Sequence, residues 1–503
     1  MSDKKRLLLF LFAWMTASFA HAQKARDTKP NIIYILSDDL NWGDTGPFGQ
    51  TQIKTPNIDR IAEEGIKFTE AYAGNAVCAP SRSCLMQGKD PGHARVRDNS
   101  YKGYRESLQP GDLTVAALLQ KAGYVTGIFG KWGLSNYNQP GLPNDMGFDE
   151  FFGYLNQQHA HNYYPQFLYH NKTRVYYPEN GDHYKLENYA VPNPYDSEGK
   201  AHPLGIADPS KAKYAFDEYA SRGLDFVRKN KDKPFFLYLA YTIPHGNLIV
   251  PSLGIYKDKD WLLQYKEWAA MITRMDTEIG KLLDLLKSLH LDNNTIIFFS
   301  GDNGNPTGHD REYIKKNEKV LTISQFFHAQ SPTRGQKGDS YDGAFHVPAL
   351  VRWPHHIAPG QVSDFKWAFW DFLPTAADIA GIKPPSDIDG VSILPTLLKK
   401  GKQQIHEYFY WEFERNQAVR YGKWFAHRVN GGKVELYDLS TDPQQSADLS
   451  ARYPDIVHHI KAIIDKEHTP SDVWPSPGET PAAFQQRLKL HHVPKRENNL
   501  STY

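Results

Sequence analysis

Sulfur and bulk charge are both scarce in this sequence of 503 residues. It has only two cysteines, and its 58 basic side chains nearly balance 57 acidic ones. Two cysteines exclude a scaffold held together by many disulfides. The near-neutral charge gives no support to binding of nucleic acid or anionic membranes. Repeats and low-complexity blocks are also lacking, and the composition, 40% hydrophobic and 23% charged, predicts one large globular domain with a smaller one.

The N-terminus has the pattern of a secretory signal. A basic cluster at residues 4–6 precedes an apolar run over residues 7–17, and the small-x-small triplet Ala20-His21-Ala22 follows. We expect cleavage after Ala22, export to the periplasm or the medium, and a mature net charge of about −1. The apolar run is short for a membrane span, and no cysteine follows it to take a lipid anchor. We therefore expect no membrane insertion after cleavage.

Apolar, β-branched runs that end in polar residues alternate with helical patterns along most of the chain. The strand-like runs cover residues 31–39, 123–131, 234–245 and 295–304. The helical patterns cover residues 113–121, 213–229 and the stretch "WAAMITRMDTEIGKLLDLLKSL". This alternation predicts an α/β fold with a large, mostly parallel sheet between two layers of helices.

The pattern changes after about Leu398. The stretches "EYFYWEFE", "QAVRYGKWFAHRV" and "KVELYDL" are aromatic and alternating, which predicts a small antiparallel sheet, and a helix should follow from Pro454 to about Lys466. We therefore divide the chain into a signal (1–22), a large main domain (23–400) and a C-terminal subdomain (401–503).

Oxygen-bearing side chains follow two of the predicted strands. Asp38 and Asp39 end the first strand, and Asp302 and Asn303 end the last. A lone Asp-Asp or Asp-Asn pair more often caps a helix or a turn. Two such pairs at equivalent ends of a parallel sheet can meet in one crevice, and their oxygen donors suit a hard divalent cation such as Ca²⁺ or Mg²⁺.

Both cysteines lie in the stretch "NAVCAPSRSCLMQG", residues 75–88. A Cys78–Cys84 disulfide is one interpretation, because export favours oxidation. However, Pro80 stands where a helix can begin, which places Cys78 at the positive end of that helix with Arg82 one turn on. That position suits an anion, and helix geometry would hold Cys84 away from Cys78. A functional cysteine is the favoured interpretation.

The stretch "CAPSR", with Leu85 and Gly88 after it, resembles the CxPSRxxLxTG signature of the type I sulfatases in the alkaline phosphatase superfamily. The resemblance covers nearly the whole mature chain, through "PNIIYILSDDLNWGD", "TPNIDRIAEEGIKFTEAYA", "GKW", "IPH", "GDNG", "RGQKGDSYDGAFHVPALVRWP" and "DFLPTAADIAG". It implies an alkaline phosphatase-like fold and hydrolysis of sulfate esters, as in the arylsulfatases and carbohydrate sulfatases.

The resemblance also implies a maturation step and a bound metal. A formylglycine-generating or sulfatase-maturating enzyme would oxidise Cys78 to formylglycine. One hydroxyl of the hydrated aldehyde would attack sulfur to give a covalent sulfate ester, and the reforming aldehyde would expel sulfate. Ca²⁺ would be held by Asp38, Asp39, Asp302 and Asn303.

Four further side chains take roles from the same resemblance. Arg82 would steady the diol, Lys131 and Lys337 would neutralise the sulfate oxygens, and His245 would protonate the leaving alcohol. Taken singly, Lys131 could be a solvated strand end, Lys337 a surface-loop residue and His245 a strand terminator. Their order along the chain favours the catalytic interpretation.

The sequence departs from the family pattern at two positions. Gln87 replaces the usual threonine of the signature, which bears on its recognition by the maturation enzyme. In "GKWGL", Gly133 stands where many sulfatases have a histidine that helps to deprotonate the formylglycine hydroxyl. His159 and His161 in "NQQHAHNYYP" would point the same way on an extended chain. We expect one of them to replace the base or bind substrate; otherwise both are surface histidines.

The sequence indicates the substrate less directly than it indicates the reaction. The segment Glu150–Tyr195 is rich in Tyr, His and Asn, which suits sugar recognition but also an ordinary surface loop. Arg95 and Arg97 could meet a uronate or a second sulfate, or could be structural. We expect a sulfatase acting on a sulfated carbohydrate, such as a galactose or N-acetylgalactosamine sulfate. The alternatives are a phosphonate or phosphate ester hydrolase of the same superfamily and an inactive binding protein.

Overall fold

The computed structural model describes residues 29–99, 106–137, 139–180, 211–246, 248–306 and 320–490. The predicted signal and its cleavage site lie outside this part of the chain, as do residues 181–195 of the Tyr/His/Asn-rich segment. Among the helices of the described ranges, none is both long and apolar enough to cross a membrane.

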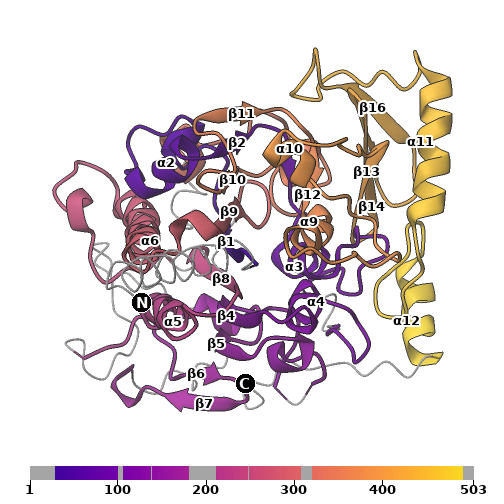
Figure 1. Cartoon of the computed structure of the whole chain (residues 1–503). Helices are drawn as coiled ribbons and strands as arrows, with labels where there is room; N and C mark the ends of the chain where they lie inside the picture. Colours follow the sequence, from indigo (N-terminus) through magenta and orange to yellow (C-terminus); the bar gives the residue numbers. More distant parts are fainter. Residues whose placement is uncertain are drawn as a thin grey trace, which may run out of the picture.

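A ten-stranded sheet forms the centre of the molecule (Figure 1). All of its strands except β10 and β6 run in the same direction, which confirms the predicted mostly parallel sheet. In spatial order the strands are β11 (Gln361–Ser363), β2 (Ile66–Phe68), β10 (Ala349–Arg352), β9 (Thr295–Gly301), β1 (Asn31–Asp38), β8 (Phe235–Pro244), β4 (Val125–Lys131), β5 (Glu150–Tyr154), β6 (Phe167–His170) and β7 (Thr173–Tyr176).

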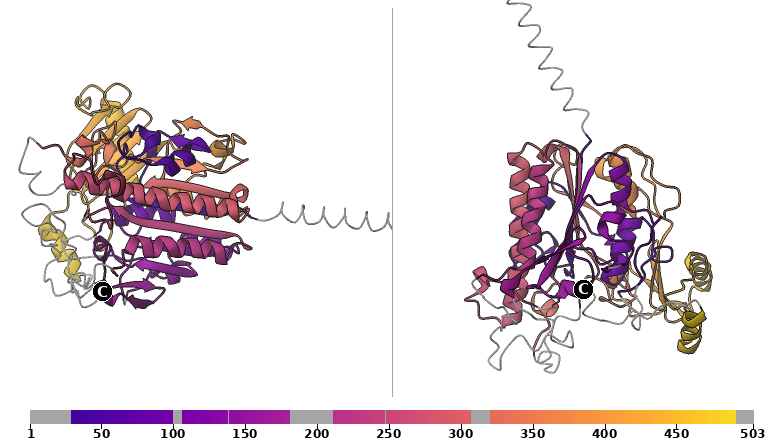
Figure 2. Two further views of the ribbon diagram at one scale, coloured as in Figure 1. Left: turned by 90° about the vertical axis from the view of Figure 1, so that its left-hand side faces the viewer. Right: turned by 90° about the horizontal axis from the view of Figure 1, so that it is seen from below.

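Helices cover both faces of this sheet (Figure 2, right). Alternation along β1 explains why, because Ile33 and Ile35 enter one core while Ile32 and Tyr34 enter the other. The first core is closed by α2 (Pro56–Glu63), α5 (Ala215–Lys229) and α6 (Leu263–Ser288). The second is closed by α3 (Cys78–Gln87), α4 (Val115–Lys121), α9 (Phe372–Ile379) and α10 (Leu394–Leu398). A short helix, α8 (Ile323–Phe326), and a two-stranded sheet of β3 (Ala71–Tyr72) and β12 (Trp367–Ala368) complete this part.

The C-terminal part forms a separate four-stranded antiparallel sheet, as predicted (Figure 1). Its strands are β13 (Tyr408–Phe413), β14 (Asn416–Tyr421), β15 (Trp424–Arg428) and β16 (Val434–Asp438). One face packs Trp411 against Phe345 of the larger domain, and the other face receives Ile460 and Ile464 of α11 (Pro454–Glu467). A further helix, α12 (Pro481–Leu490), was not predicted.

Arg97 lies where the C-terminal sheet joins the larger sheet-and-helix part of the chain. Its Nη1 atom is 2.8 Å from Glu412 Oε1, and the residue is only 8% exposed. The guanidinium also donates to the backbone carbonyls of Gly92, Ala94 and Thr469. Contact of Arg97 with substrate therefore stays a prediction, while its described partners give it a structural role. Arg95 likewise pairs with Asp112, at 2.8 Å from Nη2 to Oδ1.

Replacement of Arg97 by alanine should destabilise the protein. The change leaves Glu412 buried without its guanidinium partner, and breaking a buried pair in this way costs about 3–5 kcal/mol. Denaturant unfolding measures the loss. As a control, Lys433→Ala should leave the unfolding midpoint nearly unchanged, because Lys433 pairs with Asp448 at the surface. An unchanged midpoint for Arg97→Ala together with a raised KM would instead make Arg97 a substrate contact.

Candidate active site

The predicted metal ligands meet at the carboxyl edge of the sheet. Ser37 of β1 is paired with Gly301 of β9, so that Asp38 and Asp302 leave adjacent strands side by side. Asp39 follows in a left-handed conformation with φ 63°, and its backbone N–H donates to Asp302 Oδ1 at 3.1 Å. The prediction that these carboxylates converge is thus consistent with the geometry.

The cysteine of the "CAPSR" stretch opens helix α3 at this edge. The helix begins at Cys78, two residues before the predicted start at Pro80, and all of its residues are buried. Cys78 Sγ lies 3.3 Å from Asp38 Oδ1 and 3.6 Å from Lys337 Nζ. Both thiols are free, and Cys84 Sγ faces the carbonyl of Gly74. The disulfide interpretation is therefore wrong.

Three basic side chains pair with the three carboxylates of this cluster. Lys131 ends β4, Arg82 lies on α3, and Lys337 comes from the loop before β10. The shortest pairs are Lys131 Nζ–Asp38 Oδ2 at 2.6 Å, Arg82 Nη2–Asp302 Oδ2 at 2.9 Å and Lys337 Nζ–Asp39 Oδ2 at 2.6 Å. Positive side chains thus surround the sulfur atom of Cys78, as an anionic group on the substrate would require.

The pKa values of Asp38 and Asp302 are shifted in opposite directions. Burial alone would raise the pKa of the Asp38 carboxyl, but Lys131, His245 and Arg82 outweigh it and hold that pKa well below its usual range. By contrast, burial and the charge of Asp38 raise the pKa of Asp302 to about 7. A further cation beside Asp302 would therefore stabilise its ionised form.

The donor set fits a hard divalent cation. Asn303 donates through Nδ2 to Asp39 Oδ1 at 2.7 Å, while its own Oδ1 is buried and has no hydrogen-bond partner among the described residues. Three carboxylates and an unused amide oxygen at one point are ligands that Ca²⁺ prefers. The observed arrangement therefore suits the predicted calcium ion.

Of the two predicted histidines, only His161 reaches the cluster. His245 Nε2 is 3.3 Å from Asp39 Oδ2, and the ring of His161 stacks on that of His245 with centroids 4.2 Å apart. His159 packs instead against Tyr154 and Phe167. Residues 159–161 form a 3₁₀ turn and not the extended chain that we predicted. Alternate side chains diverge on such a turn, so the prediction of a shared pocket for both rings is wrong.

Burial controls the protonation of both histidines of this turn. It lowers the pKa of His161 to about 3, with a further contribution from the charge of Lys131. It lowers the pKa of His159 to about 3 as well, aided by Arg174. Both rings are therefore neutral at physiological pH, and a neutral ring at position 161 can accept a hydrogen bond.

A glutamine occupies the space that a side chain at Gly133 would need. Gly133 has φ +78°, and a Cβ atom built there would lie 2.3 Å from Gln157 Nε2. The amide of Gln157 also donates to the Gly133 carbonyl at 3.3 Å. Gln157 thus fills the space that the missing histidine would need, and the sequence analysis did not predict this role for it. The signal was present, because Gln157 lies in the same "NQQHAHNYYP" stretch as His159 and His161.

Comparison with protein families agrees with this geometry. The family model described as Sulfatase matches residues 30–382. The model described as N-sulphoglucosamine sulphohydrolase, C-terminal, matches residues 336–469. Together these matches include the cysteine, all the predicted metal ligands and the four-stranded C-terminal sheet.

Individual proteins and structures give the same result. Human N-acetylgalactosamine-6-sulfatase is 32% identical over 415 residues, which cover 79% of this chain and 71% of the relative. Bovine arylsulfatase A is 30% identical over 468 residues, covering 89% and 84%. The structure of Ps i-CgsB in complex with k-i-k-neocarrahexaose has a TM-score of 0.71 at 26% identity, covering 94% of this chain and 100% of the other. The chain belongs to the sulfatase family.

Proposed function

We propose that this sulfatase removes sulfate from galactose or N-acetylgalactosamine units of a glycan, with Cys78 matured to formylglycine and Ca²⁺ held by Asp38, Asp39, Asp302 and Asn303. The observation that carries the proposal is the position of Cys78 Sγ, 3.3 Å from Asp38 and 3.6 Å from Lys337. In the mature enzyme an oxygen of formylglycine would take the place of this sulfur.

The thiol itself is poorly suited to act as the nucleophile. Burial, and next the charge of Asp38, raise the pKa of the Cys78 thiol far above its usual range. A thiol held protonated in this way is a weak nucleophile. Conversion to formylglycine by a maturation enzyme removes the difficulty, because the hydrated aldehyde presents a hydroxyl at the same place.

The surrounding side chains would then bind the sulfate group and protonate the leaving group. Lys131, Lys337 and Arg82 carry positive charge at the positions where sulfate oxygens gain negative charge. His245 would donate a proton to the departing alcohol oxygen. Burial lowers the pKa of this imidazole, so the negative charge of the bound sulfate would have to stabilise its protonated form. Bound Ca²⁺ would supply additional positive charge beside the nucleophile and the sulfate. Net hydrolysis converts sulfate ester and water into alcohol and sulfate.

The substrate class is supported by relatives whose names refer to carbohydrates. One is named for N-acetylgalactosamine 6-sulfate, and one similar structure holds a neocarrahexaose. The N-terminal signal pattern supports export to the periplasm or the medium, where such glycans are accessible. The alternative of a phosphonate or phosphate ester hydrolase has support only from the fold, because the phosphonate monoester hydrolase of Agrobacterium radiobacter is 19% identical with a TM-score of 0.62.

Release of sulfate from defined saccharides tests this function. We expect purified protein, with formylglycine detected in the Cys78 peptide by mass spectrometry, to desulfate galactose or N-acetylgalactosamine sulfates in a saccharide panel. Cys78→Ala should lower kcat by at least about a thousandfold, because it removes the nucleophile. Faster cleavage of an aryl phosphate diester than of the matching aryl sulfate would reject the sulfatase assignment, and an unmodified Cys78 in active protein would reject the formylglycine mechanism.

Removal of calcium should abolish activity and lower thermal stability. Without the ion, Asn303 Oδ1 lacks a partner and the raised pKa of Asp302 favours its neutral form. Differential scanning fluorimetry after chelation, followed by stepwise addition of Ca²⁺, should show Tm rising with the ion. At a hundredfold excess over Kd the stabilisation is about 2.7 kcal/mol. Asp302→Asn protein should show a much smaller Ca²⁺-dependent rise, and an equal rise in both proteins would contradict the assigned ligand set.

His161 should contribute to turnover through its ring nitrogens. If it takes over the base function lost at Gly133, His161→Ala and His161→Phe should both lower kcat by about a hundredfold or more. The matched control is His159→Phe, which keeps the ring packing against Tyr154 and Phe167 and should retain near wild-type kcat. Full activity of His161→Phe would show that His161 serves only to stack on His245.

A further inference from the structure

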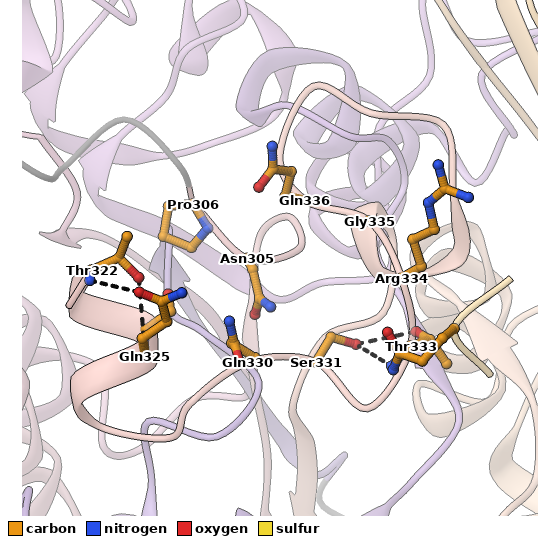
Figure 3. Close-up of a pocket in the computed structure, with 12 residues that line it drawn as sticks. Asn305, Pro306, Thr322, Gln325, Gln330, Ser331, Thr333, Arg334, Gly335 and Gln336 are labelled. Carbon is orange, nitrogen blue, oxygen red and sulfur yellow. Dashed lines mark hydrogen bonds between the residues drawn. The ribbon is translucent and has the colours of Figure 1, made fainter. Parts of the chain in front are cut away.

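Beside the active site lies a second cavity of about 620 Å³. This size falls within the roughly 300–1,000 Å³ typical of ligand pockets. Figure 3 shows Asn305 between Gln336 on one side and Gln330 on the other, with Gln325 facing the same hollow. The described lining residues are Asn305, Pro306, Thr322, Ser324, Gln325, Gln330, Ser331, Thr333, Arg334, Gly335, Gln336 and Gln444.

Amides and hydroxyls dominate this lining, which includes no carboxylate among its described residues. Asn305 is only 8% exposed, and its Oδ1 accepts a hydrogen bond from the Trp42 N–H at 3.4 Å. The side chains of Gln330 and Gln336 are exposed, so a ligand can reach their amides. Amides both donate and accept, so this set matches the alternating donors and acceptors of sugar hydroxyls.

The pocket shares its wall with the catalytic cluster. Asn305 follows the predicted metal ligand Asn303 by two residues, and its carbonyl accepts the Lys337 N–H at 2.7 Å. Gly335 and Gln336, which line the pocket, directly precede Lys337 in the chain. The loop that brings Lys337 to the catalytic cluster thus also carries residues that line the pocket.

One positive side chain lies at the pocket. The guanidinium of Arg334 stacks on Tyr341, 3.8 Å from the ring centroid, and its Nη1 donates to the Gln445 carbonyl at 2.8 Å. These two contacts hold the planar group in one orientation. An oriented guanidinium is well suited to a sulfate or carboxylate substituent.

We propose that this pocket is a second saccharide subsite. Its amides would bind an uncharged sugar ring of an oligosaccharide, and Arg334 would bind an anionic substituent of the same oligosaccharide. The inference rests on the proposed carbohydrate sulfatase function and deepens it, because it makes a glycan chain the preferred substrate over a monosaccharide or an aryl sulfate.

Kinetics on substrates of different length test the subsite. Wild-type enzyme should have a kcat/KM at least about tenfold higher for a sulfated oligosaccharide than for the corresponding monosaccharide. Gln330→Ala and Gln336→Ala each remove an amide that contacts the second sugar. Each should therefore lower the ratio of oligosaccharide to aryl sulfate kcat/KM by about fivefold or more. Arg334→Gln should have this effect only on oligosaccharides that carry a second anionic group.

A control variant and a binding measurement complete the test. Gln404→Ala changes an exposed glutamine outside the pocket and should keep the wild-type ratio. Calorimetry with the Cys78→Ala protein measures oligosaccharide binding without turnover, and adding Gln330→Ala should weaken that binding by a similar factor. Unchanged ratios and unchanged affinity in the pocket variants would overturn the subsite. Absence of sulfate release from every saccharide by the wild type, with binding intact, would overturn the proposed function but leave the subsite in place.

Discussion

The structure depends on a balance of buried charge at the carboxyl edge of the sheet. Asp38, Asp39 and Asp302 are buried together with Arg82 and Lys131, while Lys337 is 18% exposed. Each buried ion costs several kcal/mol unless it is well paired. The parallel pairing of β1 with β9 places two of these carboxylates side by side, and the cations then arrive from α3, β4 and the loop of Lys337. The ion pairs that offset the cost of burial also fix positive groups where a sulfate would bind. The same contacts therefore stabilise the fold and preorganise the site electrostatically.

The C-terminal subdomain supports the segments that carry this cluster. Trp411 stacks on Phe345 with ring centroids 4.7 Å apart, and its indole N–H donates to the Ala73 carbonyl at 3.1 Å. Asn75 in turn donates to the carbonyl of Glu412 at 2.9 Å. The small sheet thus holds the chain just before α3 and the chain just after the Lys337 loop. Its aromatic residues position Cys78 without contacting it.

The proximity of the charged residues could be predicted because strand ends are determined by topology. In a parallel sheet the carboxyl ends share an edge, so Asp38, Asp302, Lys131 and His245 had to lie near one another once the strands were identified. Hydrophobic periodicity does not predict the path of a loop. The prediction that His159 and His161 share one pocket was wrong for this reason. The filling of the Gly133 position by Gln157 was hidden for the same reason, since it depends on contact between two irregular segments. The amides around the second cavity carry no spacing signature at all.

The charged cluster and the second cavity are built on structures of different rigidity. The charged cluster is built on strand ends and a helix start, where neighbouring hydrogen bonds leave little freedom. The second cavity is built on loops, and its Arg334 is tied to the C-terminal subdomain through the carbonyls of Pro443 and Gln445. Since Gln444 itself lines the cavity, the subdomain contributes directly to that surface. Loops of this kind tolerate substitution better than the sheet does, so the lining of the cavity can change while the charged cluster stays the same.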